Sequence, residues 1–221
     1  MNGLRSVEES YGTEFIRKGI HLLSLLIPVV YYFISRNTAL AILIPLTLAF
    51  GLSDVARLTI PSVGRVYSRL FGFLLRAHER NDTGRHLNGA TYVLLAASIL
   101  VFFFPKVIVI TAFAILIVSD SSAALIGRRF GRRRFLTKSF EGAAAFFISA
   151  LVVVALAPKV EYLLLEYMIG AVGALVGALV EASAVGFDDN LSIPLSVGCV
   201  MWILYTWLLP AVNVFKLDGL A

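Results

Sequence analysis

Long apolar segments joined by short polar connections dominate the chain. A helix needs about 20 consecutive, mostly apolar residues to cross the hydrocarbon core of a bilayer. Seven segments come close to that length: Phe15–Ile34, Thr38–Ala56, Leu87–Phe104, Val107–Ile126, Phe140–Ala157, Tyr167–Val185 and Ile193–Leu209. Short connections favour antiparallel neighbours. The pattern therefore predicts an all-α polytopic bundle of about seven membrane-spanning helices, forming a single domain over residues 1–221.

The connection from Leu58 to His86 has a different periodicity. Its apolar residues recur at helical spacing at Val63, Val66, Tyr67, Leu70, Phe71, Leu74 and Leu75, with Arg65, Arg69 and Arg76 on the opposite side. This pattern is typical of an amphipathic helix lying in the membrane interface. Such a helix either anchors the bundle or borders an entrance for lipid. The small residues between Gly170 and Ala178, by contrast, indicate close helix packing.

Composition agrees with a membrane protein and excludes other classes. Of the 221 residues 59% are hydrophobic and only 15% charged, whereas soluble domains carry roughly 25% charge. A soluble enzyme and a disordered chain are excluded, and the single cysteine excludes an internal disulfide. The net charge of +5 needs no nucleic acid partner, because topology alone makes many membrane proteins basic. The sequence leaves the oligomeric state open.

The lysines and arginines predict the orientation. With the N-terminus in the cytoplasm, all but four of these 19 residues fall on the cytoplasmic side, and the four outside are Arg36, Lys106, Lys159 and Lys216. This distribution follows the positive-inside rule. We therefore expect a multi-pass integral membrane protein with a cytoplasmic N-terminus and an external C-terminus.

Acidic residues gather on the same side. Glu14, Asp54, Asp120, Glu141 and Glu181 lie near the predicted cytoplasmic ends of apolar helices, and Asp188 and Asp189 lie just beyond one. Carboxylates contribute little to topology, and ionisable groups inside membrane helices are costly enough to favour a functional role. The acids therefore predict an active site embedded at the cytoplasmic face.

Two helical faces carry the first candidates. Glu14, Arg17, Lys18 and His21 share one face of the first predicted helix, although an Arg-Lys pair at a helix end can also simply snorkel. Asp120, Ala124, Gly127 and Gly131 are spaced four, three and four residues apart. Small residues admit another backbone or a phosphate, and ordinary packing explains them equally well. Asp120 itself needs a cation or hydrogen-bond donors at that depth.

The arginine-rich loop that follows is the next candidate. It holds Arg128, Arg129, Arg132, Arg133 and Arg134, and then Lys138, Ser139, Glu141 and Gly142 at the start of a predicted helix. Helix N-termini suit phosphate oxygens. The arginines alone could instead set topology or contact anionic lipid.

Acidic residues after the sixth predicted span complete the set. Glu181 and Asp188 are seven residues apart, and Asp188, Asp189 and Asn190 are consecutive. Hard oxygen ligands of this kind suit Mg²⁺. The alternative is a solvated acidic loop that caps the following helix.

In this order, the segments resemble the polyprenol kinase family, which includes dolichol kinase, phytol kinase and the CTP-dependent diacylglycerol kinase. The matching elements are Arg17-Lys18-x-x-His21, Leu87-Asn88-Gly89-Ala90-Thr91-Tyr92, Asp120-x-x-Ala123-x-x-x-Gly127-x-x-x-Gly131, Lys138-Ser139-x-Glu141-Gly142, and Glu181-Ala182 followed by Asp188-Asp189-Asn190. Ser119 stands where we expect glycine, and Ser139 where threonine is usual. The resemblance implies a CTP-dependent kinase that phosphorylates the hydroxyl of a membrane alcohol: a polyprenol, phytol or diacylglycerol.

The resemblance and the residue chemistry together give each candidate a role. The expected catalytic residues are Arg17, Lys18, Asp120, Glu141, Glu181 and Asp189. The expected CTP-binding residues are Gly127, Arg128, Gly131, Arg132, Lys138, Ser139 and Gly142, and the expected Mg²⁺ ligands are Asp120, Asp188 and Asp189. Asp54, Glu181 and Asp189 all remain candidates for accepting the proton of the alcohol.

Two other functions compete with a lipid kinase. A phosphatidate cytidylyltransferase would also use CTP but would release pyrophosphate, and the chain lacks the lysine-aspartate and glycine-histidine-glycine-glycine signature that we associate with that enzyme. A transporter would bind its cargo near the middle of the bilayer, whereas the acids of this chain gather at one face.

Overall fold

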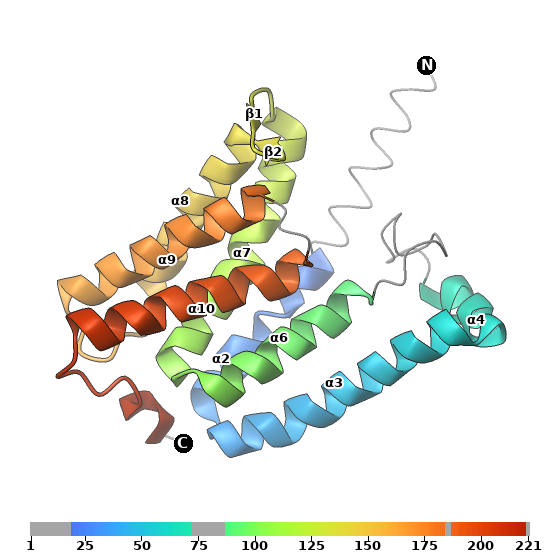
Figure 1. Cartoon of the computed structure of the whole chain (residues 1–221), viewed down its shortest axis with the longest axis horizontal. Helices are drawn as coiled ribbons and strands as arrows, with labels where there is room; N and C mark the ends of the chain where they lie inside the picture. Colours follow the sequence, from blue (N-terminus) through green and yellow to red (C-terminus); the bar gives the residue numbers. More distant parts are fainter. Residues whose placement is uncertain (1–18, 72–86, 184–186, 220–221) are drawn as a thin grey trace.

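The computed structural model describes residues 19–71, 87–183 and 187–219. In chain order the elements are α2 (Leu26–Phe33), α3 (Arg36–Thr59), α4 (Pro61–Phe71), α6 (Gly89–Phe103), α7 (Lys106–Phe130), β1 (Arg134–Phe135), β2 (Lys138–Ser139), α8 (Phe140–Leu156), α9 (Leu164–Ser183), α10 (Asp189–Leu208) and the 3₁₀ helix η1 (Lys216–Gly219). The prediction of a helical bundle is confirmed (Figure 1). The short β1–β2 hairpin was not predicted.

Four helices, α3, α7, α9 and α10, are long and apolar enough to cross a membrane. Three shorter apolar helices, Gly19–Phe33, Gly89–Phe103 and Phe140–Leu156, coincide with the other three predicted spans. By length and composition the described residues thus support four spans, and the predicted total of seven is not confirmed.

The first of the shorter helices is interrupted just before α2. Pro28 has no N–H, and its ring displaces the carbonyl group four residues earlier, that of Ser24. The Ser24 carbonyl accepts instead from the Ile27 N–H at 2.9 Å, and the Leu25 N–H reaches back only to Leu22. These three-residue hydrogen bonds tighten the turn and explain why the helix is not continuous over the predicted segment.

Helix α7 forms the centre of the bundle. It packs most extensively against α8 and also contacts α10 and α2, while α9 packs on both α8 and α10. Phe113, Ile115 and Leu116 of α7 are fully buried, as expected for a helix that is apolar on all sides. Helix α3 lies at the edge of the bundle against α6, and most of its apolar residues are exposed (Figure 1).

The amphipathic helix is confirmed over the described part, α4. Helix α4 spans these positions, and Val63, Arg65, Val66 and Arg69 are all exposed. The predicted continuation through Leu74, Leu75 and Arg76 lies outside the described residues. The location of α4 in the membrane interface remains a prediction.

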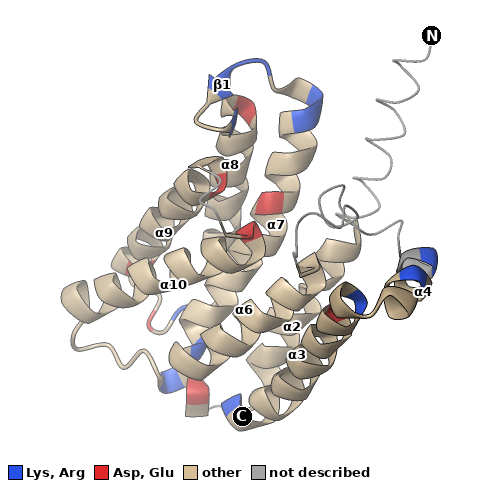
Figure 2. Cartoon of the chain, turned by 45° about the vertical axis from the view of Figure 1, so that its right-hand side comes forward, with Lys and Arg blue, Asp and Glu red and all other residues tan. Residues whose placement is uncertain are grey.

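Charged residues lie mainly near the ends of the helices, with uncharged segments between them (Figure 2). One end of the bundle contains the β1–β2 hairpin and is called the hairpin end here. The starts of α6, α8 and α10 and the ends of α7 and α9 lie at this end, and the opposite end is called the far end (Figure 1). The alternation follows from antiparallel neighbours joined by short connections.

We expect this alternation to correspond to the two sides of the membrane. Topology reporters fused after Arg134 and after Asn190 should read cytoplasmic, because both positions lie at the arginine-rich hairpin end. A reporter fused after Lys159, in the α8–α9 connection, should read external. A cytoplasmic signal after Lys159 would contradict the alternation.

Close packing of α9 generates a second prediction. A Cβ atom at Gly177 would lie 3.1 Å from both the Phe146 ring of α8 and Val197 of α10, whereas a Cβ atom at Gly51 on α3 would meet nothing within 4 Å. We expect Gly177→Val to destabilise the protein by about 1–3 kcal/mol through overpacking. Gly51→Val is the matched control, and thermal unfolding of both variants in detergent provides the measurement. Equal melting temperatures would refute the tight α8–α9–α10 contact.

Candidate functional site

The loop between α7 and α8 is a structured hairpin. Gly131 ends α7, and its N–H donates to the Gly127 carbonyl at 3.0 Å. Strand β1 then pairs antiparallel with β2. Leu136 at the turn has a φ of 53°, which lies in the left-handed region of the backbone that residues other than glycine seldom adopt. The hairpin reverses the chain so that α8 begins directly after β2.

Two sets of hydrogen bonds hold this hairpin in place. The Glu141 carboxylate accepts from the backbone N–H groups of Arg132 at 3.0 Å and Arg133 at 3.3 Å. The Thr137 N–H and hydroxyl both donate to the Ala182 carbonyl near the end of α9, at 3.0 and 2.7 Å. Glu141 therefore has a structural role in the hairpin. Its predicted catalytic role remains a prediction.

The predicted small-residue face brings α7 and α8 into close contact. A Cβ atom at Gly127 would lie 3.0 Å from Ser139 Oγ and 3.4 Å from Gly142 Cα, and one at Gly142 would lie 3.2 Å from the Ala123 carbonyl oxygen. Ser139 also caps α8, because its Oγ accepts from the Gly142 N–H at 3.1 Å. Protein atoms thus fill the space beside Gly127 and Gly142, which agrees with the approach of another backbone.

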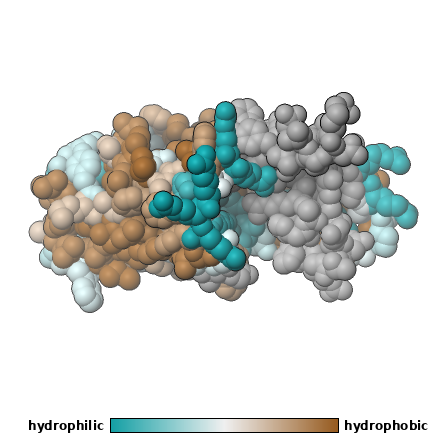
Figure 3. All heavy atoms as spheres, turned by 90° about the horizontal axis from the view of Figure 1, so that it is seen from above, coloured by the Kyte–Doolittle hydropathy of each residue, from teal (hydrophilic) through white to brown (hydrophobic). Residues whose placement is uncertain are grey.

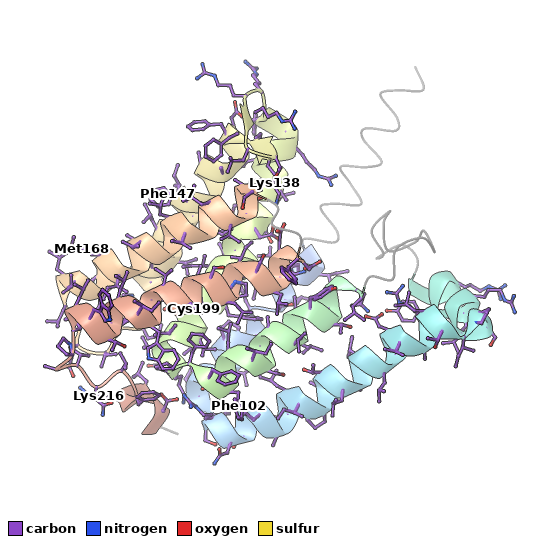
Figure 4. The ribbon with its side chains drawn as sticks, viewed as in Figure 1. Phe102, Lys138, Phe147, Met168, Cys199 and Lys216 are labelled. Atoms are coloured by element: carbon purple, nitrogen blue, oxygen red, sulfur yellow. The ribbon has the colours of Figure 1, made fainter. Side chains whose placement is uncertain are left out.

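Lys138 lies at the point where the hairpin meets α9 and α10 (Figure 4). Its Nζ is 2.8 Å from Glu181 Oε1 and 2.9 Å from Asp189 Oδ2. Burial opposes the charge of the ammonium group, but the two carboxylates outweigh burial, and the pKa of Lys138 is raised above its ordinary value. Three predicted site residues from distant parts of the sequence therefore form one ion-paired cluster, the lysine bridge.

The three side chains of the lysine bridge differ in their exposure to solvent. The Glu181 side chain is 5% exposed, that of Asp189 is 24% exposed and that of Lys138 is 33% exposed. The second carboxylate oxygen of Glu181, Oε2, is buried and has no hydrogen-bond partner among the described residues. A buried acceptor left in this condition costs free energy, so this oxygen is suited to receive a further donor or cation.

Asp120 of α7 extends the cluster toward the first helix. Its Oδ2 is 3.9 Å from His21 Nε2, and its carboxylate interacts electrostatically with Glu181 and Asp189. Asp120 is largely buried. The sequence prediction that carboxylates of different helices share one end of the bundle is confirmed for these residues.

Asp188 and Asp189 have different partners although they are adjacent. Asp188 caps α10, because its Oδ1 accepts from the Asn190 N–H at 2.9 Å and from Asn190 Nδ2 at 2.7 Å. This is the capping role left open by the sequence. Within residues 19–71, 87–183 and 187–219, no group of three or more His, Cys, Asp or Glu side chains is arranged to hold a metal ion. The predicted Mg²⁺ ligand set of Asp120, Asp188 and Asp189 stays a prediction.

The remaining predicted residues divide into two groups. Arg17 and Lys18 lie outside the described residues. Arg128 and Arg132 are exposed, as are Arg129, Arg133 and Arg134. Viewed from above, hydrophilic residues form a band next to a broad hydrophobic surface (Figure 3). The exposed guanidinium groups lie at the end where the lysine bridge is found.

Sequence reasoning did not predict the environment of Asp54. Its carboxylate is fully buried and accepts from Arg57 Nε at 2.7 Å, from the Asn88 N–H at 2.7 Å and from Thr91 Oγ1 at 2.7 Å. Asn88 caps α6 and also donates to the Tyr67 hydroxyl of α4. These contacts favour a structural role for Asp54 as the joint of α3, α4 and α6. The cap sequence Asn88-x-x-Thr91 is the signal that could have indicated it.

The far end contains buried ionic groups that the sequence analysis treated as external charges. Glu166 is fully buried and accepts from the N–H groups of Val160 at 2.7 Å and Leu163 at 3.0 Å and from the Tyr205 hydroxyl at 3.0 Å. Lys106 is buried as well, and its Nζ donates to the Ile34 carbonyl. These contacts join the start of α9 to the α8–α9 connection and to α10, and the start of α7 to the end of α2.

The Asp54 joint can be tested by removing its carboxylate. Asp54→Ala removes a fully buried carboxylate that pairs with Arg57 and accepts from Asn88 and Thr91, and we expect a loss of about 3–5 kcal/mol in stability. Glu161→Ala removes the partner of Lys216 in an exposed pair with Nζ–Oε1 of 2.7 Å and should cost less than about 1 kcal/mol. Thermal unfolding in detergent measures the stability of both variants. Equal stability of the two would show that the Asp54 carboxylate does not stabilise the joint of α3, α4 and α6.

Comparison with known proteins finds a relative that aligns over most of the chain. The chain is 31% identical over 208 residues to an uncharacterized protein, RP860, of Rickettsia prowazekii (strain Madrid E). The aligned region covers 91% of this chain and 98% of the Rickettsia protein. No protein-family model and no solved structure matches the chain.

Proposed function

We propose that this chain, which belongs to the same family as the Rickettsia protein, is a CTP-dependent kinase that phosphorylates the hydroxyl group of a membrane alcohol. The observation that carries the proposal is the lysine bridge. A lysine in the arginine-rich β1–β2 hairpin contacts two carboxylates at one end of an apolar bundle. Phosphoryl transfer needs this combination, because cations must neutralise the triphosphate while carboxylates hold a metal and accept a proton.

The cationic part of the site suits a nucleoside triphosphate. Arg128 in the last turn of α7 and Arg132 between α7 and β1 are exposed at the hairpin end, and guanidinium groups bind phosphate oxygens through paired hydrogen bonds. The Gly142 N–H is already bonded to Ser139 Oγ. Side chains, rather than this amide at the start of α8, are therefore expected to supply most of the positive charge.

The acidic part suits a magnesium ion bound together with the nucleotide. Mg²⁺ in such sites binds one or two carboxylates plus phosphate oxygens, and Glu181 has a buried oxygen without a partner in the described part of the chain. The carboxylates of Asp120 and Asp189 interact electrostatically with the Glu181 carboxylate. When bound, the ion supplies neutralisation of charge on the β- and γ-phosphates.

The proposed reaction requires one proton acceptor. The hydroxyl oxygen of the alcohol forms a bond to the γ-phosphorus, the bond from this phosphorus to the β–γ bridging oxygen breaks, and CDP leaves. The hydroxyl proton passes to a carboxylate, for which Glu181 and Asp189 are the candidates at the lysine bridge. Asp54 is less suited, because its carboxylate already accepts four hydrogen bonds, from Arg57, from the backbone N–H and side-chain amide of Asn88, and from Thr91.

The apolar surface of the bundle favours a lipid as acceptor. Large apolar residues such as Leu156, Leu164 and Trp207 are strongly exposed, as is usual for residues that face lipid. An alcohol with a long hydrocarbon chain can lie along such a surface with its hydroxyl at the polar end. The identity of this alcohol, a polyprenol, phytol or diacylglycerol, is left to experiment.

The competing functions make different demands on the same residues. A cytidylyltransferase would direct the nucleophile at the α-phosphorus and release pyrophosphate. A transporter would need its binding groups near the middle of the bundle, but the lysine bridge lies at the hairpin end (Figure 4). The position of the carboxylates therefore favours chemistry on a lipid headgroup over transport.

The proposed role of Asp120 in binding the metal ion allows a direct test of the kinase. Purified protein incubated with CTP, Mg²⁺ and a panel of the three alcohols should form CDP, and no pyrophosphate, with at least one of them. Asp120→Asn should abolish this activity, because it removes the charge while keeping the size and hydrogen bonding of the side chain. Glu161→Gln, at the exposed pair of the far end, is the control and should keep parental activity.

Activity in a folded Asp120→Asn variant equal to that of the parent would overturn the assignment of this residue. Formation of pyrophosphate in place of CDP would favour the cytidylyltransferase. Chromatography of the nucleotide products distinguishes these outcomes directly.

A further inference from the structure

A cation already occupies the space between two carboxylates at the hairpin end. The ammonium group of Lys138 is 2.8 Å from Glu181 Oε1 on α9 and 2.9 Å from Asp189 Oδ2 on α10. These distances are typical of charge-assisted hydrogen bonds. The ammonium therefore does for the carboxylates what a bound metal ion would also do, which is to neutralise two negative charges brought together by folding.

The same space suits a divalent cation in one further respect. Lys138 uses only one oxygen of Glu181, and the other oxygen, Oε2, is buried without a hydrogen-bond partner in the described ranges. The Glu181 side chain as a whole is 95% buried, since only 5% of it is exposed. A metal ion can take both oxygens of a carboxylate, whereas the lysine leaves one of them unsatisfied.

Protein ligands alone are too few for a tight metal site. Among the described residues, no set of three or more His, Cys, Asp or Glu side chains is arranged around one point. Mg²⁺ commonly completes such a site with phosphate oxygens of a bound nucleotide and with water. The two carboxylates of the lysine bridge thus fit a metal that arrives together with a triphosphate.

We propose that Lys138 is a placeholder cation, which Glu181 and Asp189 hold in the nucleotide-free protein and exchange for a divalent cation when a nucleoside triphosphate binds. In the exchange, two ammonium–carboxylate hydrogen bonds break and no covalent bond changes. The released ammonium then donates to oxygens of the polyphosphate. The identity of the incoming ligand rests on the proposed function, but the competition between lysine and metal does not.

The local structure allows this exchange without rearrangement of the backbone. Thr137 is bonded twice to Ala182, and Ser139 caps α8, so both neighbours of Lys138 are fixed. The Lys138 side chain itself is one-third exposed. A rotation of this side chain is therefore enough to vacate the space between the carboxylates.

Binding of Mn²⁺ to the full-length protein in detergent, without nucleotide, tests the competition. Paramagnetic resonance of free Mn²⁺ gives the affinity. We expect Lys138→Met to bind Mn²⁺ about tenfold more tightly than the natural sequence, or tighter still, because the competing charge is gone. Lys138→Arg keeps a cation and should resemble the natural sequence, and adding Glu181→Gln to Lys138→Met should remove the gain.

Equal Mn²⁺ affinities of the natural sequence and a folded Lys138→Met variant would overturn the proposal. A second measurement needs no variant. Acylation of lysines, followed by peptide mass spectrometry, should become several-fold faster at Lys138 when Mn²⁺ is saturating and stay unchanged at Lys216, which pairs with Glu161 at the far end. An unchanged rate at Lys138 would also overturn the exchange.

These readouts separate the exchange from the enzyme activity. Mn²⁺ binding that behaves as expected, in a protein that phosphorylates none of the alcohols, would support the exchange and contradict the kinase. Kinase activity with Mn²⁺ affinity unaffected by Lys138→Met would support the kinase and contradict the exchange.

Discussion

The bridge from Lys138 to Glu181 and Asp189 connects three parts of the chain that are distant in sequence. It joins the β1–β2 hairpin to the end of α9 and the start of α10. Carboxylates in an apolar bundle need compensation, because an isolated buried charge is very costly. The lysine supplies this compensation, and the hairpin can present it only because Thr137 and Glu141 fix its backbone. The candidate site at the hairpin end depends on this arrangement.

Buried carboxylates of this protein differ in how completely they are satisfied. Asp54 accepts from Arg57, Asn88 and Thr91, and Glu166 accepts from three backbone N–H groups and Tyr205. Both join helix ends and have the contacts of structural residues. Glu181, by contrast, keeps a buried oxygen without a partner among the described residues. This difference in hydrogen bonding is the physical reason for proposing a chemical role for Glu181 and a structural role for Asp54.

Much of the fold follows from hydropathy, since apolar helices occur at all seven predicted positions. The proline-dependent break before α2 and the β1–β2 hairpin could not be predicted, because both depend on a few local hydrogen bonds and not on periodicity. The convergence of Asp120, Glu181 and Asp189 could be predicted, because each lies near a helix end on the same predicted side. Their pairing with Lys138 could not, since it depends on how the hairpin docks. At the far end, the charge distribution predicted only that Lys106 and Glu166 lie on the external side. It could not predict that both side chains are buried.

We propose that the hairpin end transfers the terminal phosphoryl group of CTP to a lipid hydroxyl. Its most direct test compares CTP labelled at the γ-phosphorus with CTP labelled at the α-phosphorus, each incubated with the purified protein, Mg²⁺ and the alcohol panel. We expect the γ-label to enter the lipid fraction and the α-label to remain in the nucleotide fraction. Transfer of the α-label, or no transfer of either label to any alcohol, would contradict it.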